Sequence, residues 1–543
     1  MAKTRGADLV ARTLAQAGAK QIFSLSGNHI MPLYDAALDA ELAITHVRHE
    51  NAAVHMADAW GRLTEAPGIV WLTGGPGHAN GIGALYTALE SESPLVLISG
   101  HAPLSELGRG SFQEMAQADM AAPVAKASWT AQKAESLGED VARALRIAMS
   151  GRPGPVHLSL PFDLLEANVE SHTVPADAFR PRPRALPETA ADAVIELLER
   201  AQRPLVLAGA VMASTRSREL RKRLEDALGV PIVCMESPRG LNDPAQGALA
   251  EMVSRADAIV LLGKKPDFTV KFGKPPAISP MCRVAVIDPE QSVLERAKTI
   301  LGAQRVMLAE LADSVAAAEQ LIGRAHPRNP LTWLREVGAA LRVRPFDPAA
   351  SASRSDSAVH PVDVGRAVQA LIDASPEPLL VSDGGEFGQW AQACVSAPTR
   401  VINGQAGSIG SAIPFALAAK VARPSSTVIA MSGDGACGFH LLEMETAMRA
   451  GLAFVVVVGN DACWNAEHQI QLRAYGRERA HGCELQPTRY DQVVTALGGH
   501  GELVTRAADL PAALSRAVAS GKPALVNVMI ERLPAPTVPA KPS

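Results

Sequence analysis

The chain has 543 residues, enough for about three domains, and at 47% hydrophobic and 20% charged it has the composition of an ordinary globular protein. Its formal net charge of −4 gives no general reason to expect nucleic acid as a partner. The six cysteines show neither paired close spacing nor histidines at zinc-site intervals, which predicts reduced thiols in a cytoplasmic protein. The N-terminal stretch lacks the long apolar region of a signal peptide, and we expect no membrane span.

The first predicted domain, residues 1–173, alternates helix-like stretches with short β-rich runs at 21–25, 68–72 and 94–98. Polar residues follow these runs. Asn28 and His29 come after the first, and an imidazole there can exchange protons near neutral pH. A glycine-rich turn at 74–80 follows the second, and the segment around Gln113 follows the third. Glu50 lies between the first two runs, directly after Arg48 and His49.

The second predicted domain, residues 188–343, is bounded by proline-rich linkers at 174–187 and 344–361. Its β-rich runs lie at 204–207, 258–262 and 283–287. Basic residues follow the second of these runs, and an acidic residue ends the third. A basic loop and an acid at strand ends can hold the phosphates and a ribose hydroxyl of a nucleotide. The candidates are Lys264, Lys265, Lys271, Lys274 and Asp288.

The third predicted domain, residues 362–535, precedes a short tail at 536–543 and has β-rich runs at 379–381, 427–431 and 453–458. The run at 427–431 leads into 432–436, where we expect a tight glycine turn, and then into a helix at 439–450 that Gly451 ends. This β-α-β unit places Asp434 and Asp461 in loops at the carboxyl ends of neighbouring strands. Each can give a hard oxygen to one Mg²⁺. Strands that alternate with helices in all three blocks predict an α/β protein of three doubly wound parallel-sheet domains.

The combination of Gly433-Asp434-Gly435 with Asn460-Asp461, and with the distant Glu50, resembles the thiamine diphosphate (ThDP)-dependent decarboxylase and acetolactate-synthase-like superfamily. The resemblance covers nearly the whole chain and implies pyrimidine-binding, central and diphosphate-binding domains, in that order. It implies ThDP and Mg²⁺ as cofactors, with the metal held by Asp434, Asp461 and the main-chain carbonyl of Cys463. One departure is Asp461, where the family has asparagine, which adds a negative charge to the site.

The same resemblance assigns roles to further residues. Glu50 matches the glutamate that hydrogen-bonds the aminopyrimidine ring and promotes deprotonation of the thiazolium. Gln113 and His29 match positions near the reacting carbon, and Ile409 matches the apolar residue that holds the cofactor bent. The remaining implied cofactor-binding residues are Pro76, Gly77, Asn80, Gly385, Glu386, Phe387, Gly407, Ser408, Gly433, Gly435, Ala436 and Trp464. Family members place the cofactor between two subunits, which implies a homodimer core, usually doubled to a homotetramer.

Two segments favour one branch of the superfamily. Residues 459–464 (GNDACW) and 382–392 (SDGGEFGQWAQ) look like the 2-hydroxyacyl-CoA lyase branch. That resemblance implies cleavage of a 2-hydroxyacyl-CoA to an aldehyde or ketone and formyl-CoA, a reversible reaction. The basic loop of the second domain is then the candidate site for the nucleotide of coenzyme A (CoA). Two alternatives stay open: an acetolactate-synthase-like or benzaldehyde-lyase-like enzyme acting on 2-keto acids or acyloins, and a catalytically silent scaffold with the same fold.

Overall fold

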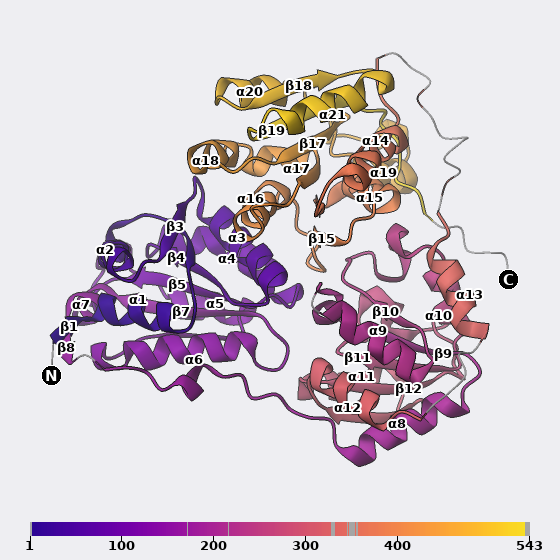
Figure 1. Cartoon of the computed structure of the whole chain (residues 1–543), viewed down its shortest axis with the longest axis horizontal. Helices are drawn as coiled ribbons and strands as arrows, with labels where there is room; N and C mark the ends of the chain where they lie inside the picture. The colour runs from indigo at the N-terminus through magenta and orange to yellow at the C-terminus, as the bar shows by residue number, and fades with distance from the viewer. Residues whose placement is uncertain are drawn as a thin grey trace. The chain divides into compact units, whose positions relative to one another are not determined.

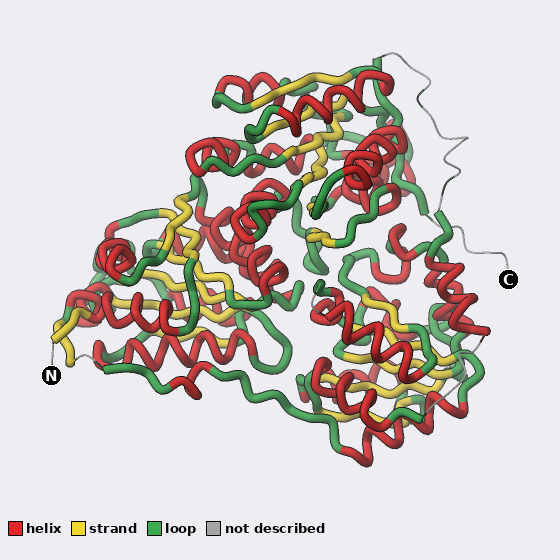
Figure 2. The backbone as a smooth tube through the Cα atoms, in the orientation of Figure 1, coloured by secondary structure: helices red, strands yellow, loops and turns green. Residues whose placement is uncertain are grey.

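The structure is a computed structural model of the chain, and it describes residues 3–170, 172–215, 217–326, 332–344, 346, 353 and 357–537. The linker predicted at 344–361 and the tail predicted at 536–543 lie largely outside these residues. Three sheets, each with all its strands parallel, carry the fold, and helices flank each of them (Figure 2). The predicted α/β class with three parallel sheets is therefore confirmed. In the described part of the chain, no helix has both the length and the apolar character needed to cross a membrane.

The first sheet has the order β3-β2-β4-β5-β7-β6. All the runs predicted for this block are strands, and the third extends three residues further than predicted. The strands are β2 (Gln21–Leu25), β3 (Ala43–His46), β4 (Gly68–Leu72), β5 (Leu95–His101), β6 (Ala127–Thr130) and β7 (Pro155–Pro161). The helices are α1 (Gly6–Gln16), α2 (Met31–Asp39), α3 (Glu50–Thr64), α4 (Pro76–Glu90), α5 (Gln117–Ala121), α6 (Leu137–Met149) and α7 (Phe162–Glu166). A short antiparallel pair, β1 (Lys3–Arg5) with β8 (Asn168–Glu170), joins the two ends of the block.

The third block repeats this topology. Its sheet has the order β15-β14-β16-β17-β19-β18, so numbering the strands of either block from one gives the same order, 2-1-3-4-6-5. The strands are β14 (Leu379–Ser382), β15 (Thr399–Ile402), β16 (Val428–Gly433), β17 (Val455–Asn460), β18 (His500–Val504) and β19 (Ala524–Met529). The helices are α14 (Pro361–Ala374), α15 (Gly385–Cys394), α16 (Ala412–Ala422), α17 (Asp434–His440), α18 (Glu443–Ala450), α19 (Asn465–Tyr475), α20 (Tyr490–Ala496) and α21 (Leu510–Ala519).

The first and third blocks belong to one compact unit, Met1–Pro181, Arg354–Gly388 and Thr399–Leu533. One hydrophobic core runs through both blocks. The helix α16 is apolar almost all round and packs against α3, whose buried face includes Val54 and Ala57 (Figure 1). A helix that is apolar on all sides is stable only when it is covered on all sides. Packing between α3 and the strands β14 and β16 meets this requirement and fixes α3, which begins at Glu50, against the third block.

The second compact unit comprises Arg182–Ser353, Gln389–Pro398 and Pro534–Ser543. Its parallel sheet has the order β10-β9-β11-β12-β13. The strands are β9 (Pro204–Ala208), β10 (Ile232–Cys234), β11 (Ala258–Leu262), β12 (Arg283–Asp288) and β13 (Val306–Leu311), and the helices are α8 (Glu188–Arg200), α9 (Ser217–Leu228), α10 (Leu249–Arg255), α11 (Gln291–Leu301), α12 (Ser314–Arg324) and α13 (Thr332–Leu341). The three strands predicted here from apolar runs are all present.

Two local predictions in the third block were wrong. Residues 432–436 do not form a tight glycine turn: Gly433 has a φ of −70° and the chain enters α17 directly at Asp434. The predicted single helix at 439–450 is split into α17 and α18 at Leu441 and Leu442. Gly451 ends α18 with a φ of +64°, as its position in the sequence predicted.

Candidate functional site

A pocket of about 450 Å³, a volume that includes its open mouth, lies at the carboxyl ends of β14, β16 and β17. In a sheet of this order, β14 and β16 flank the point where the strand order reverses, which is where open α/β sheets bind ligands. The loops after these three strands and the segment around Ile409 line the pocket. The lining residues are Gly384, Gly385, Glu386, Phe387, Ile409, Gly433, Asp434, Gly435, Ala436, Gly459, Asp461, Cys463, Trp464, Asn465, Ala466 and Glu467.

Most of the cofactor-binding residues expected in the third block therefore gather in one place. Gly407 and Ser408 are not among the lining residues, and the Ser408 hydroxyl instead bonds to Thr87 of α4 at 2.7 Å. Ile409 is partly exposed at the pocket wall, as a residue that contacts a ligand has to be.

The pocket lining carries four acidic side chains and no lysine, arginine or histidine. Asp434 and Asp461 face the same space, and Asp434 Oδ2 accepts a hydrogen bond of 3.2 Å from the backbone N–H of Cys463. Burial raises the pKa of Asp434 to about 6. Burial and the neighbouring Asp434 raise the pKa of Asp461 to about 7. Two carboxylates in one pocket repel each other, and a shared cation would relieve the repulsion.

This donor set fits a hard divalent cation. A diphosphate cannot enter an acid-lined pocket without a positive charge to bridge it, and carboxylate and carbonyl oxygens are the ligands that Mg²⁺ takes in proteins. Asp434, at the start of α17, and Asp461 and Cys463, in the segment after β17, all line this pocket. The residues present thus fit a magnesium–diphosphate group.

Two glycines let aromatic rings close the pocket wall. A Cβ on Gly435 would lie 2.5 Å from the Trp464 ring, and a Cβ on Gly459 would lie 2.3 Å from the Phe387 ring. Both distances are shorter than any real Cβ contact, so any larger residue would displace a ring. The second glycine of the Gly-Asp-Gly motif is therefore required by packing against Trp464.

In the first block, Glu50 lies among the residues expected to accompany it. It starts α3, where a carboxylate is stabilised by the positive end of the helix dipole, and His49 caps the helix by accepting the Asn51 N–H at 3.1 Å. The Asn80 amide donates to Glu50 Oε2 at 3.1 Å. A Cβ on Gly77 would lie only 3.4 Å from Glu50 Oε1, so the first turn of α4 lies close to this carboxylate.

His29 and Gln113 contact the turn that precedes α4. His29 is buried, its Nδ1 lies 3.2 Å from the Thr73 hydroxyl, and its ring stacks on Phe112. Burial lowers the pKa of His29, so the ring is neutral at pH 7 and can accept a proton. Gln113 packs against Gly75 and has a left-handed backbone, with a φ of +57°. The structure thus brings together every residue proposed for the first block.

None of these first-block residues is among those that line the diphosphate pocket. The residues expected to bind the pyrimidine and those expected to bind the diphosphate therefore form two groups among the described residues.

Three residues that sequence reasoning missed hold these loops in place. The buried Gln117 accepts the Gly75 N–H at 2.7 Å and donates to the Gly100 carbonyl at 3.0 Å, so it ties the turn to β5. Asp383 accepts backbone N–H groups from Gly384 and Gly410 at 2.8 and 2.9 Å, which joins two walls of the pocket.

The third missed residue is Glu443 of α18. One oxygen, Oε1, accepts the backbone N–H groups of Arg48 and His49 at 2.9 and 3.0 Å, while Oε2 accepts the Thr446 hydroxyl at 2.6 Å. Burial raises the pKa of Glu443, and the hydrogen bonds from Thr446 and the two N–H groups oppose this effect. A residue of the third block thus holds the peptide groups directly before Glu50. No local signal marks Glu443, because its partners lie almost 400 positions away in the sequence.

Of the residues predicted to bind a nucleotide in the second unit, some are buried and some are exposed. Lys264 is buried, and its ammonium lies 3.1 Å from the Asp267 carboxylate. Asp288 ends β12 as expected, but its side chain is fully buried and accepts the Glu290 N–H at 3.0 Å. Lys271 and Lys274 are exposed, and the Lys274 ammonium lies 5.9 Å from the centre of the exposed Phe272 ring. Lys265 is partly exposed.

Comparison with known proteins agrees with this geometry. Residues 4–120 match the thiamine pyrophosphate enzyme N-terminal TPP binding domain, and residues 383–528 match the corresponding C-terminal TPP binding domain. An acetolactate synthase large subunit from Mycobacterium tuberculosis is 33% identical over 96% of this chain and 95% of its own length. A 2-hydroxyacyl-CoA lyase 2 from Caenorhabditis elegans is 29% identical (97% and 90%), and a 2-hydroxyacyl-CoA lyase from Oryza sativa is 28% identical (97% and 96%). The two matched domains cover the blocks that hold Glu50 and the acid-lined pocket, and the chain belongs to the thiamine pyrophosphate enzyme family.

Proposed function

We propose that the chain is a ThDP- and Mg²⁺-dependent carbon–carbon lyase that cleaves a 2-hydroxyacyl-CoA to an aldehyde or ketone and formyl-CoA. The observation that carries the cofactor part is the acid-lined pocket, in which Asp434 and Asp461 have no cationic side chain among the lining residues to balance them. The substrate part rests on the segments 382–392 and 459–464 and on relatives that are named 2-hydroxyacyl-CoA lyases.

Different residues of the chain would bind the cofactors and transfer protons. Asp434, Asp461 and the Cys463 carbonyl hold the cation and, through it, the diphosphate. When bound, ThDP supplies a nucleophilic carbon and an electron sink for the bond that breaks. Glu50, at the start of α3, shares a proton with the pyrimidine ring, and Asn80 orients its carboxylate. His29, neutral and buried beside Thr73, can take the proton of the substrate hydroxyl as the C1–C2 bond breaks.

The direct test is to incubate the enzyme, ThDP and Mg²⁺ with a 2-hydroxyacyl-CoA and to look for formyl-CoA and the shortened carbonyl compound. Omitting either cofactor should abolish both products. The runner-up is an acetolactate-synthase-like enzyme, favoured by the relative that is 33% identical. Rapid turnover of pyruvate with no cleavage of the thioester would establish the runner-up. No turnover of any substrate by protein that binds ThDP would indicate a silent scaffold.

We propose that the CoA moiety contacts the exposed lysines of the second unit, Lys271 and Lys274, beside the exposed Phe272 ring. Replacing both lysines by alanine should raise the KM for the thioester and weaken its dependence on salt, because surface charge pairing is screened by ions. The matched control replaces Lys222 and Lys298, which are exposed on helices of the same unit, and should leave the KM unchanged.

We also propose a homodimer core, doubled to a homotetramer, in which each site combines Glu50 of one copy with Asp434 of another. The absence of Glu50 and its described neighbours from the lining of the diphosphate pocket supports this arrangement. The test mixes two inactive variants, Glu50→Gln and Asp434→Ala, and allows subunits to exchange. Random pairing regenerates one intact site in each mixed dimer, or about a quarter of the wild-type activity. A site formed within one chain would recover none.

A further inference from the structure

The loop that follows β17 is held from two sides. On one side the segment 483–485 bonds to it: Trp464 N donates to the Cys483 carbonyl and Leu485 N donates to the Ala462 carbonyl, both at 2.8 Å. On the other side lies the last part of the unit, residues 530–533. Ile530 N donates to the Asn460 carbonyl at 3.0 Å, and the Asn465 amide donates to the Leu533 carbonyl at 3.0 Å.

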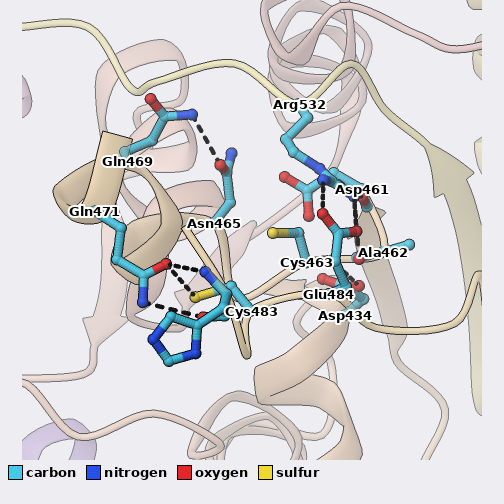
Figure 3. A network of polar contacts seen from close by, with 11 residues as sticks. Asp434, Asp461, Ala462, Cys463, Asn465, Gln469, Gln471, Cys483, Glu484 and Arg532 are labelled. Atoms are coloured by element: carbon cyan, nitrogen blue, oxygen red, sulfur yellow. Dashed lines mark hydrogen bonds and ion pairs between the residues drawn. The ribbon is translucent and has the colours of Figure 1, made fainter. Parts of the chain in front are cut away.

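Arg532 is the residue that connects both sides (Figure 3). Its Nη2 donates to the carbonyls of Asp461 and Ala462 at 3.0 and 3.2 Å, and its Nε lies 3.3 Å from the Asp461 carbonyl. The other edge of the guanidinium forms a bidentate pair with Glu484, at 2.7 and 3.0 Å. The guanidinium therefore bonds two consecutive carbonyls of the loop after β17 and also Glu484 in the segment 483–485. Only arginine offers donors in this fork geometry.

The backbone that Arg532 holds is strained. Ala462 has a φ of +53°, the left-handed region, where a residue with a Cβ is disfavoured by ~1 kcal/mol or more. The carbonyls that Arg532 bonds belong to this residue and to Asp461, which precedes it. A conformation of this kind persists only where its surroundings enforce it. Without the guanidinium, the loop would be expected to relax and to turn the Asp461 carboxylate and the Cys463 carbonyl away from their present positions.

We propose that Arg532 is a positioning residue for the cation-binding loop, and that the segment 530–533 is thereby part of the cofactor site of this protein. The proposal rests on the proposed function only in that Asp461 and Cys463 hold the cation. Arg532 itself is not among the residues that line the pocket, so it acts through the loop and not by touching the ligand.

The test measures cation affinity separately from catalysis. Arg532→Ala should weaken Mg²⁺ binding at a fixed ThDP concentration, measured by calorimetry, on the order of tenfold, as the loss of a residue behind a metal ligand does. The kcat at saturating Mg²⁺ and ThDP should stay within about twofold, because the residues at the reacting atoms are unchanged. The matched control is Arg516→Ala, which removes an exposed bidentate pair with Glu502 in the same unit and should leave the affinity intact. Unchanged affinity in Arg532→Ala, or an equal loss in the control, would overturn the proposal.

A second variant separates loop geometry from general stability. Glycine adopts a positive φ without cost, so adding Ala462→Gly to Arg532→Ala should restore much of the lost affinity. Glu484→Gln, which keeps the contacts of Arg532 with the two carbonyls, should lose far less Mg²⁺ affinity than Arg532→Ala.

If Arg532→Ala does not fold, Arg532→Lys gives the same information. An ammonium cannot bond both carbonyls and the carboxylate with fork geometry, so this variant should lose part of the Mg²⁺ affinity. No rescue by Ala462→Gly would contradict the strain argument. Tight Mg²⁺–ThDP binding without thioester cleavage would refute the proposed function and leave this inference standing.

Discussion

Replacing Asp461 by asparagine should make the cofactor-free protein more stable at high pH. The folded protein holds the Asp461 pKa at about 7, because of burial and of the nearby Asp434, whereas the ordinary value is 3.8. A carboxyl whose pKa is raised on folding contributes most stability below its unfolded pKa. That contribution is lost as the pH rises toward the folded pKa. The asparagine amide stays neutral at every pH, so the variant does not lose this stability as the pH rises.

The size of the effect follows from the same values. The difference of about three between the folded and ordinary pKa values sets an upper limit of ~4 kcal/mol on the free energy of unfolding lost at high pH, at ~1.4 kcal/mol for each pKa unit. The side chain is partly exposed and lies beside a second carboxyl, so we expect about half of this limit. The variant should gain ~2 kcal/mol over the wild type between pH 4 and pH 8, mostly below pH 7.

The assay is urea unfolding of the protein in a chelator at several pH values. The control is Asp491→Asn: burial alone would raise the pKa of Asp491, but the hydrogen bonds from Arg489 and Asn527 bring it below the ordinary value, so its loss should destabilise the protein at pH 8. Adding Mg²⁺ and ThDP should erase the advantage of Asp461→Asn, because the cation neutralises the carboxylate, and the variant should still bind both. An Asp461→Asn advantage that is constant with pH, or that shrinks as the pH rises, would refute the reasoning.

Four further substitutions test the site. Asp434→Ala should weaken ThDP–Mg²⁺ binding by orders of magnitude, since the diphosphate loses a carboxylate that holds its cation, and unchanged calorimetric affinity would contradict the assignment. Glu50→Gln should leave ThDP bound but slow hydrogen exchange at its reactive carbon by orders of magnitude, as followed by NMR, whereas His29→Ala should slow only steps that involve substrate. Glu443→Gln should keep calorimetric ThDP affinity while slowing that exchange about tenfold, because the amide oxygen accepts the two N–H groups before Glu50 more weakly than a carboxylate. Wild-type exchange would show that Glu443 has no positioning role.

All nine apolar runs predicted from local patterns are strands, because buried parallel strands are continuous apolar runs that tertiary packing does not override. Strands that are only partly buried, such as β3, β6 and β18, were not predicted. Local patterns predicted the start of α17 badly. Glycines next to Asp434 suggested a turn, but the chain uses Gly435 to accommodate the Trp464 ring and continues as helix. Motif spacing also placed Asp434 and Asp461 in one pocket, since both follow neighbouring strands of one sheet.

The sequence could not identify residues whose contacts are far away along the chain. Glu443 contacts the peptide groups before Glu50, and Arg532 contacts the loop at Asp461 some 70 positions earlier. Neither lies in a motif or follows a periodicity. Their roles come from the way α18 meets the first block and from the path of the chain after β19. The burial of Lys264 could not be predicted either, because a lysine among other lysines is typical of an exposed loop. The structure shows that Lys264 is buried because it pairs with Asp267.

The absence of basic side chains from the lining of the diphosphate pocket has a physiological consequence. If magnesium supplies the positive charge that the lining lacks, the diphosphate binds there only together with the cation, and the protein needs both components to be loaded. A cell with ample thiamine but little free magnesium would hold this protein empty. Purification in a chelating buffer would strip it, and activity would return only when both components are added together.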